Sequence, residues 1–104
     1  MAVDAEVLDL QGLLPLFDDA RDELDELLAE SVRATADVIA RIEREPSVEA
    51  LHELKGIART IGAIELGNVA AELEGAARRN ESVREQLPRL REAQGRLAAA
   101  VTAN

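Results

Sequence analysis

The stretch from residue 16 to residue 44 contains neither glycine nor proline, so nothing in it interrupts a helix. Residues that suit the buried face recur in it at helical spacing; they are Phe17, Leu24, Leu28, Thr35, Val38 and Ile42. No segment of the chain alternates apolar and polar residues over the length of a strand. The sequence therefore predicts an all-α fold with its longest helix over these residues.

Proline and glycine residues divide the remainder of the chain into shorter helical segments. An amphipathic pattern over residues 4–14 predicts a short N-terminal helix that Pro15 ends or bends, because proline lacks the amide that a helix interior needs. Pro46 and Ser47 supply a stop and an N-cap, which predicts that the next helix begins near Val48.

Two further helices are indicated in the second half of the chain. Gly62 is expected to break the preceding helix, and Asn80 to end the next one. The apolar stripe of that next helix is Leu66, Val69, Ala70, Leu73, Ala76 and Ala77. Ser82 and Glu85 have the spacing of a capping box for the last helix, which Pro88 is expected to kink. Its apolar face is Val83, Leu87, Leu90, Leu97 and Val101.

Length and composition fit one helical domain over residues 1–104, an antiparallel four-helix bundle with a short additional N-terminal helix. A formal charge of −9 and a single aromatic residue argue against binding to nucleic acid or to an anionic membrane surface. The chain lacks cysteine, and it has neither a long apolar run nor a signal-like start. We therefore expect a cytoplasmic domain, and we expect it to be monomeric. The initial methionine and the end at Asn104 favour a small separate protein over a piece of a longer one.

His52 is the only histidine of the chain, and its position on the predicted helix is informative. The apolar stripe of that helix is Leu51, Leu54, Ala58 and Ile61. His52 lies roughly 140° from the mean direction of this stripe, so it should face outward. This weighs against a hydrogen-bonded core histidine and leaves a surface residue without a role, or a group that does chemistry.

The neighbours of His52 favour chemistry over an inert surface position. Lys55 and Arg59 lie on the same side of the helix, while Gly56 and Ala63 flank the other side. A glycine inside a helix costs about 1 kcal/mol relative to alanine, which is easier to understand if a partner must approach the backbone there. A neutral imidazole can accept a phosphoryl group, and fixed positive charge would hold that group during transfer.

Metal binding and hydrolysis are poorly supported. One histidine without cysteine would need several carboxylates, and only Glu49 and Glu53 lie nearby at helical spacing, so we expect no metal site on this chain. No serine has a spacing that places it beside His52. The three serines of the chain are better explained as helix or cap residues; they are Ser31, Ser47 and Ser82.

The stretch around His52 resembles histidine-containing phosphotransfer (HPt) domains of two-component phosphorelays. The pattern H-x-L-K-G-x(4)-[apolar]-G-x(3)-L is matched by His52, Leu54, Lys55, Gly56, Ile61, Gly62 and Leu66. The resemblance implies a carrier without kinase activity of its own, in which His52 accepts a phosphoryl group from a receiver-domain aspartate and passes it to another receiver. It also implies that Lys55 supplies charge support and that Gly62 lies where two helices meet.

The resemblance further implies the partners. These are receiver domains of response regulators, with a hybrid sensor kinase as a further candidate, and the receiver would bring Mg²⁺, so that this chain needs no cofactor. Gly56 would be the small residue that lets the receiver dock. The docking surface that we expect consists of Gly56, Arg59, Ala63 and Glu49.

Glu53 departs from the family pattern, in which serine or threonine usually follows the histidine. It makes the motif similar to the H-box of histidine kinase dimerisation domains, where the acidic neighbour acts on the imidazole. That box normally continues into Thr-Pro or Asn-Pro, whereas this chain has Gly56 and Ile57. The alternative to a carrier is thus a non-phosphorylated helical adaptor or dimerisation bundle, including a kinase dimerisation module.

Overall fold

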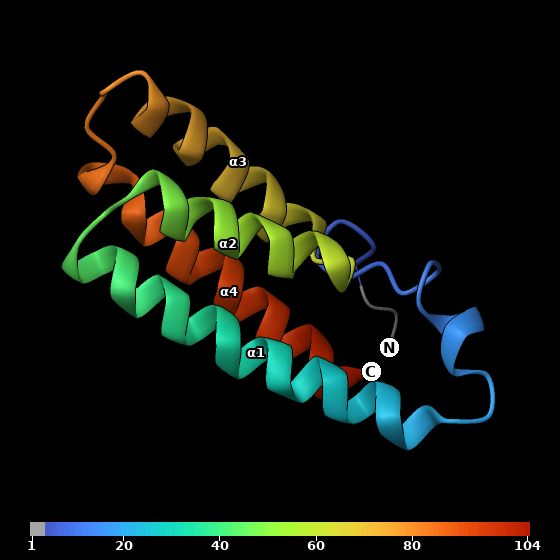
Figure 1. Cartoon of the computed structure of the whole chain (residues 1–104). Helices are drawn as coiled ribbons and strands as arrows, with labels where there is room; N and C mark the ends of the chain where they lie inside the picture. Colours follow the sequence, from blue (N-terminus) through green and yellow to red (C-terminus); the bar gives the residue numbers. More distant parts are fainter. Residues whose placement is uncertain (1–3) are drawn as a thin grey trace.

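Four α-helices pack side by side in the computed structural model of the chain, which describes residues 4–104 (Figure 1). They are α1 (Arg21–Arg44), α2 (Val48–Thr60), α3 (Ile64–Arg78) and α4 (Leu87–Ala103), and two 3₁₀ turns, η1 (Leu14–Phe17) and η2 (Arg84–Gln86), precede α1 and α4. Successive helices run in opposite directions, and no strand occurs among the described residues. The predicted all-α, antiparallel four-helix bundle is confirmed.

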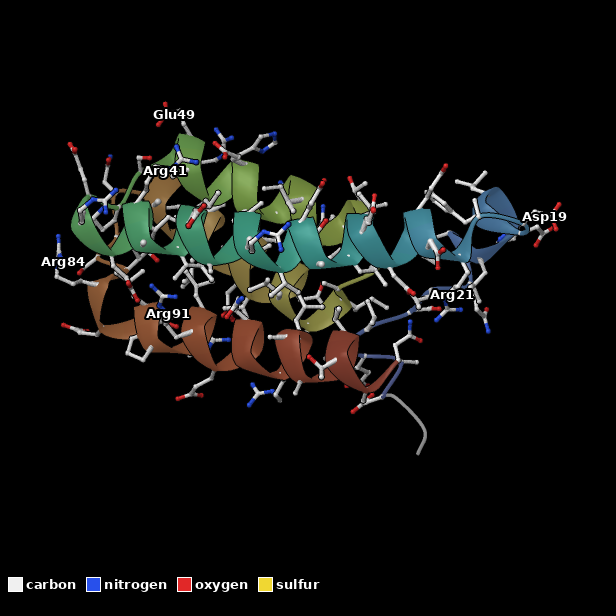
Figure 2. All side chains as sticks on the ribbon, turned by 90° about the horizontal axis from the view of Figure 1, so that it is seen from below. Asp19, Arg21, Arg41, Glu49, Arg84 and Arg91 are labelled. Carbon is white, nitrogen blue, oxygen red and sulfur yellow. The ribbon has the colours of Figure 1, made fainter. Side chains whose placement is uncertain are left out.

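The core lies along the axis of the bundle, where all four α-helices contribute apolar side chains. Its large, fully buried members are Leu24, Leu28, Ile39, Ile42, Leu51, Leu54, Ile61, Leu66, Leu73, Leu90 and Leu97. Each helix contacts its neighbours around the bundle, with α2 packed against both α1 and α3. The side chains in Figure 2 show Arg41 of α1 and Glu49 of α2 at one end of the bundle, and Asp19 at the other.

The predicted N-terminal helix over residues 4–14 is wrong. The segment forms turns, in which the carboxylates of Asp4 and Asp9 accept the backbone N–H groups of Glu6 (2.9 Å) and Gln11 (3.0 Å). Such side-chain bonds compete with the helical ladder. The segment instead lies across the turn between α2 and α3, where Leu8 is buried.

The predicted long helix begins later than residue 16. Residues 14–17 form η1, with Pro15 in its first turn, and Ala20 has a non-helical backbone (φ −131°, ψ 49°) immediately before α1. Phe17 is therefore not part of the helical stripe, although it packs against the core. From Arg21 onward the predicted helix is confirmed.

The predicted capping box of the last helix is also wrong. Residues 84–86 form η2, whose N-cap Val83 provides no side-chain cap, and α4 begins only at Leu87. Pro88 lies in the first turn of α4, where its missing amide is not needed. It therefore marks the start of the helix and does not kink it.

Candidate functional site

Helix α2 presents His52 to solvent, as its sequence register predicts. The helix is capped by Ser47, whose hydroxyl oxygen accepts the backbone N–H of Ala50 at 3.1 Å, which confirms the predicted N-cap. Leu51 and Leu54 are fully buried, whereas the side chain of His52 is 63% exposed. The imidazole is therefore accessible to a partner.

Helix α3 supplies the hydrogen-bond partner of this imidazole. The Nδ1 atom of His52 lies 2.9 Å from Oε2 of Glu74, whose side chain is only 5% exposed. An ionised carboxylate can only accept a hydrogen bond, so Nδ1 carries the proton. In the neutral ring the lone pair is consequently on Nε2.

Glu74 is held in its ionised form by three donors. Lys55 Nζ lies 2.6 Å from Oε1, and Arg78 Nη2 lies 2.8 Å from Oε2, the oxygen that also contacts His52. The hydrogen bond from Lys55, and then those from Arg78 and His52, lower the pKa of Glu74 from its ordinary value of 4.5 to about 2, against an opposing contribution from burial. Glu74 is thus an anion near neutral pH.

Sequence reasoning did not identify Glu74 as a site residue. A signal was nevertheless present, because Glu74 follows Ala70 by four residues and precedes Ala77 by three, within the apolar stripe of α3. A charge on a core-facing position needs partners to offset its desolvation. What the sequence did not show is that this position lies opposite His52.

Lys55 and Arg59 do not share one exposed face with His52 as expected. The Lys55 side chain is 20% exposed and turns toward α3, because Glu74 binds its ammonium group. Arg59 is exposed, and its Cγ packs near Gly67 of α3. Arg59 is therefore exposed as expected, whereas the expected exposure of Lys55 is wrong.

The helix surface next to His52 is bare at Gly56. A Cβ atom at this position would meet no heavy atom within 4 Å beyond its own helix, and the residue is exposed. Glu49, one turn before His52, is exposed as well. Ala63 is fully buried at the start of α3 and cannot contact a partner through its side chain, so its inclusion in the docking surface was wrong.

Glu53 is directed to a different neighbour. Its carboxylate pairs with the guanidinium of Arg41 on α1 at 2.5 Å. The acidic residue that follows His52 in sequence is thus engaged with α1, while Glu74 of α3 contacts the imidazole. The contact that an H-box glutamate would make is supplied here by another residue.

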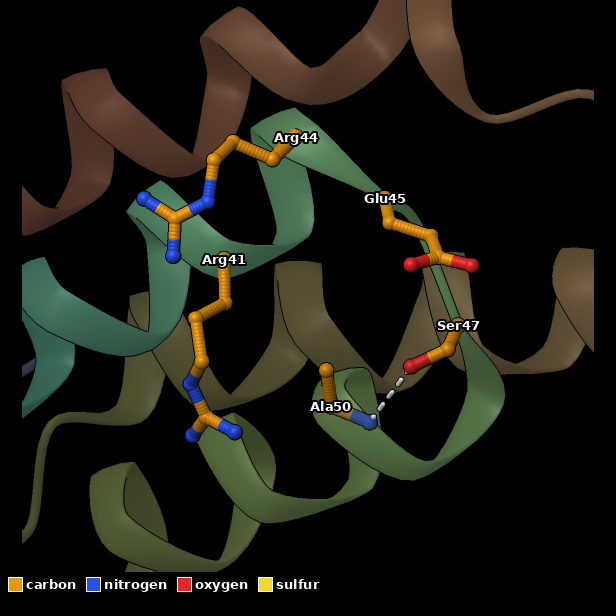
Figure 3. Close-up of a pocket in the computed structure, with 5 residues that line it drawn as sticks. All are labelled: Arg41, Arg44, Glu45, Ser47 and Ala50. Atoms are coloured by element: carbon orange, nitrogen blue, oxygen red, sulfur yellow. Dashed lines mark hydrogen bonds between the residues drawn. The ribbon is translucent and has the colours of Figure 1, made fainter.

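A shallow hollow lies where α1 connects to α2, and Figure 3 shows its lining. Its volume is about 440 Å³, and it is lined by Arg41, Arg44, Glu45, Ser47 and Ala50. His52 and Glu74 are not among these residues. Within residues 4–104, no three histidine, cysteine or acidic side chains come together as a metal would require.

A family model described as the Hpt domain matches residues 13–103, which is most of the chain. The chain belongs to the Hpt family. No curated protein and no solved structure matches it. Members of the Hpt family are phosphocarriers of two-component phosphorelays and in general not enzymes, and they interact with receiver domains. None of the helices described for this Hpt domain is long and apolar enough to cross a membrane.

Proposed function

We propose that His52 is the phosphoacceptor of this Hpt domain. Its Nε2 atom would take a phosphoryl group from the aspartate of one receiver domain and pass it to a second receiver. The observation that supports this is the exposed imidazole whose Nδ1 is held by the buried carboxylate of Glu74 at 2.9 Å. That contact directs the lone pair of Nε2 toward solvent, where a partner can reach it.

The transfer needs no further chemical group on this chain. The Nε2 lone pair attacks phosphorus, and the bond between phosphorus and the aspartyl oxygen breaks, with its electron pair returning to the receiver's carboxylate. Nδ1 keeps its proton, and Glu74 offsets the positive charge that develops on the ring. A second aspartate reverses the sequence and restores the neutral imidazole.

The bare helix surface at Gly56 supports docking of the receiver beside His52. Because no side chain stands there, the backbone of α2 is open to close approach. Glu49 and Arg59 are exposed on the same helix and form the proposed rim of this surface. Lys55 does not face the partner but contributes its charge indirectly, through the ion pair with Glu74.

An adaptor or dimerisation bundle without phosphorylation is the competing function. A docking surface alone gives no reason to bury Glu74 and hold it ionised against an exposed imidazole, since burying a charge is costly. A kinase dimerisation module would use the acidic neighbour of the histidine. Here Glu53 is paired with Arg41.

The deciding experiment is incubation with a receiver domain that carries a ³²P-labelled aspartyl phosphate. The expected result is acid-labile, base-stable label on the wild-type chain and on Arg33→Ala, an exposed residue of α1, but none on His52→Ala. Since His52 is the only histidine, its replacement removes every imidazole. Equal labelling of His52→Ala, or an unlabelled wild type with several receivers, contradicts the proposal.

A further inference from the structure

Two cations hold the carboxylate of Glu74, and they do so in different ways. Among the described residues, Lys55 alone pairs with Oε1, and its side chain is 20% exposed. Arg78 contacts Oε2 together with His52, and its side chain is 60% exposed. The lysine is thus enclosed between α2 and α3, while the guanidinium lies at the surface beside the imidazole.

Releasing these two cations from Glu74 would have unequal consequences. If Lys55 left, Oε1 would lose the only ion-pair partner that residues 4–104 give it, in a carboxylate that is almost fully buried. Leaving a buried charged acceptor without a partner is strongly unfavourable. If Arg78 left, Oε2 would still accept from His52 and Oε1 from Lys55. Arg78 is therefore the cation that can move.

A phosphoryl group on His52 would attract the guanidinium of Arg78 away from Glu74. The group brings negative charge to the imidazole, next to the carboxylate of Glu74. A guanidinium presents five N–H donors in a planar fork that matches phosphoryl oxygens, and charge-assisted bonds of this kind are about twice as strong as neutral ones. Arg78 and His52 meet at the same oxygen, so only side-chain rotation separates the two arrangements.

We infer that Arg78 is a phosphoryl-binding residue, which bonds Glu74 in the unphosphorylated protein and turns to the phosphoryl group once His52 carries it. This inference rests on the proposed role of His52. The inference gives the two cations different roles. Lys55 holds Glu74 in position, and Arg78 binds the transferred phosphoryl group. The charge that contacts the phosphoryl group thereby comes from Arg78 of α3, while Lys55 contributes its charge through Glu74.

The first test follows Arg78 directly by NMR. The full chain is phosphorylated with potassium phosphoramidate, a small-molecule donor that needs no receiver, and the side-chain ¹⁵N resonances of the arginines are compared before and after. The expected result is a shift of the Arg78 Nε signal, with no comparable shift for Arg79, which is equally exposed and pairs with Glu81. An unchanged Arg78 signal in a phosphorylated protein overturns the inference.

The second test measures how phosphoryl groups partition between a receiver and this chain. Arg78→Ala should lower the phosphorylated fraction at equilibrium, with an equilibrium constant reduced by about five- to tenfold. Arg78→Lys should recover part of the loss, and Arg79→Ala should match the wild type. Equal constants for Arg78→Ala and Arg79→Ala overturn the role of Arg78 while leaving His52 as the acceptor. A wild type that neither phosphoramidate nor a receiver can phosphorylate overturns both proposals.

Discussion

The backbone carbonyl of Gly62 accepts a hydrogen bond from the backbone N–H of Asp9 at 2.8 Å, which ties the N-terminal segment to the turn between α2 and α3. A second bond, from the N–H of Glu65 to the carbonyl of Glu6 at 2.7 Å, lies beside it. Gly62 has φ +78°, and a Cβ there would lie 1.9 Å from the Asp9 carbonyl oxygen. The segment seen next to the end of α2 in Figure 1 can therefore approach only a glycine.

Replacing Gly62 by alanine should destabilise the protein. The left-handed backbone costs a residue with a side chain about 1–2 kcal/mol, and the contact with Asp9 adds to this because the segment must move away. Urea denaturation should show a free energy of unfolding lower by at least that amount. Gly95→Ala is the control, since Gly95 lies inside α4 with open space around it and alanine there should stabilise by about 1 kcal/mol. Equal effects of the two substitutions would contradict the argument.

The pH dependence of stability should reveal Glu74. Its pKa is about 2 in the folded protein, below the ordinary value of 4.5, mainly because of the hydrogen bond from Lys55. A group with a depressed folded pKa stabilises the protein above its unfolded pKa, and this contribution disappears as the pH falls through the folded pKa. The free energy of unfolding of the wild type should therefore exceed that of Glu74→Gln near pH 6, and the difference should shrink between about pH 4.5 and 2.

The control for this experiment is Glu26→Gln, on the exposed surface of α1. It should follow the wild-type curve over the same pH range, because no partner in another helix contacts Glu26 closely enough to form an ion pair within the described residues. A difference between Glu74→Gln and the wild type that stays constant with pH would mean that Glu74 acts through its shape and not through its charge.

Lys55→Ala should cost more stability than its position in the sequence suggests. As an exposed helix residue it would change the free energy of unfolding by no more than about 0.5 kcal/mol. In the structure its removal leaves Oε1 of buried Glu74 with no ion-pair partner from residues 4–104, which costs about 1–3 kcal/mol. Thermal or urea unfolding against Arg59→Ala, an exposed cation of the same helix, measures the difference. Two equally small effects would show that water replaces the ammonium group.

The sequence predicted the parts of the fold that local chemistry determines. Ser47 caps α2 because its hydroxyl reaches the amide three residues ahead. Gly62 separates α2 from α3 because glycine adopts a positive φ more readily than other residues do. The segment at residues 4–14 was mispredicted because its amphipathic pattern also suits a chain that lies over the turn between α2 and α3. Its long-range bonds to Gly62 and Glu65 are invisible in the local pattern.

The candidate site, too, was predicted only in those features that depend on one helix alone. The exposure of His52 and the bare surface at Gly56 follow from one helical wheel, and both are confirmed. The orientation of Lys55 and the contact with Glu74 depend on how α2 and α3 are aligned along their axes, since Glu74 is separated from His52 by 22 residues. A single sequence specifies which faces are buried, but it does not specify which residue of one face meets which residue of the next.

Substitutions of Gly56 should separate an effect on receiver docking from an effect on protein stability. A Cβ at this position meets nothing within 4 Å beyond its own helix, so alanine should stabilise α2 by about 1 kcal/mol and leucine should fold without a clash. Gly56→Leu would nevertheless stand one turn from His52, where a receiver must approach. Displacing the reacting groups by about 1 Å can lower a rate a hundredfold, so transfer from a phosphorylated receiver should collapse while the melting temperature holds or rises.

The matched control is Gly95→Leu, which makes the same change inside α4, where there is also open space. Both variants should be at least as stable as the wild type, because leucine is the better helix former, but only Gly56→Leu should lose transfer. Phosphorylation by phosphoramidate adds a second comparison. That donor is far smaller than a receiver domain, so it should still label His52 in Gly56→Leu if the leucine blocks docking. Loss of labelling with both donors would instead mean that the substitution disturbs the imidazole and its bond to Glu74, and that the bare surface at Gly56 does not serve the approach of a receiver.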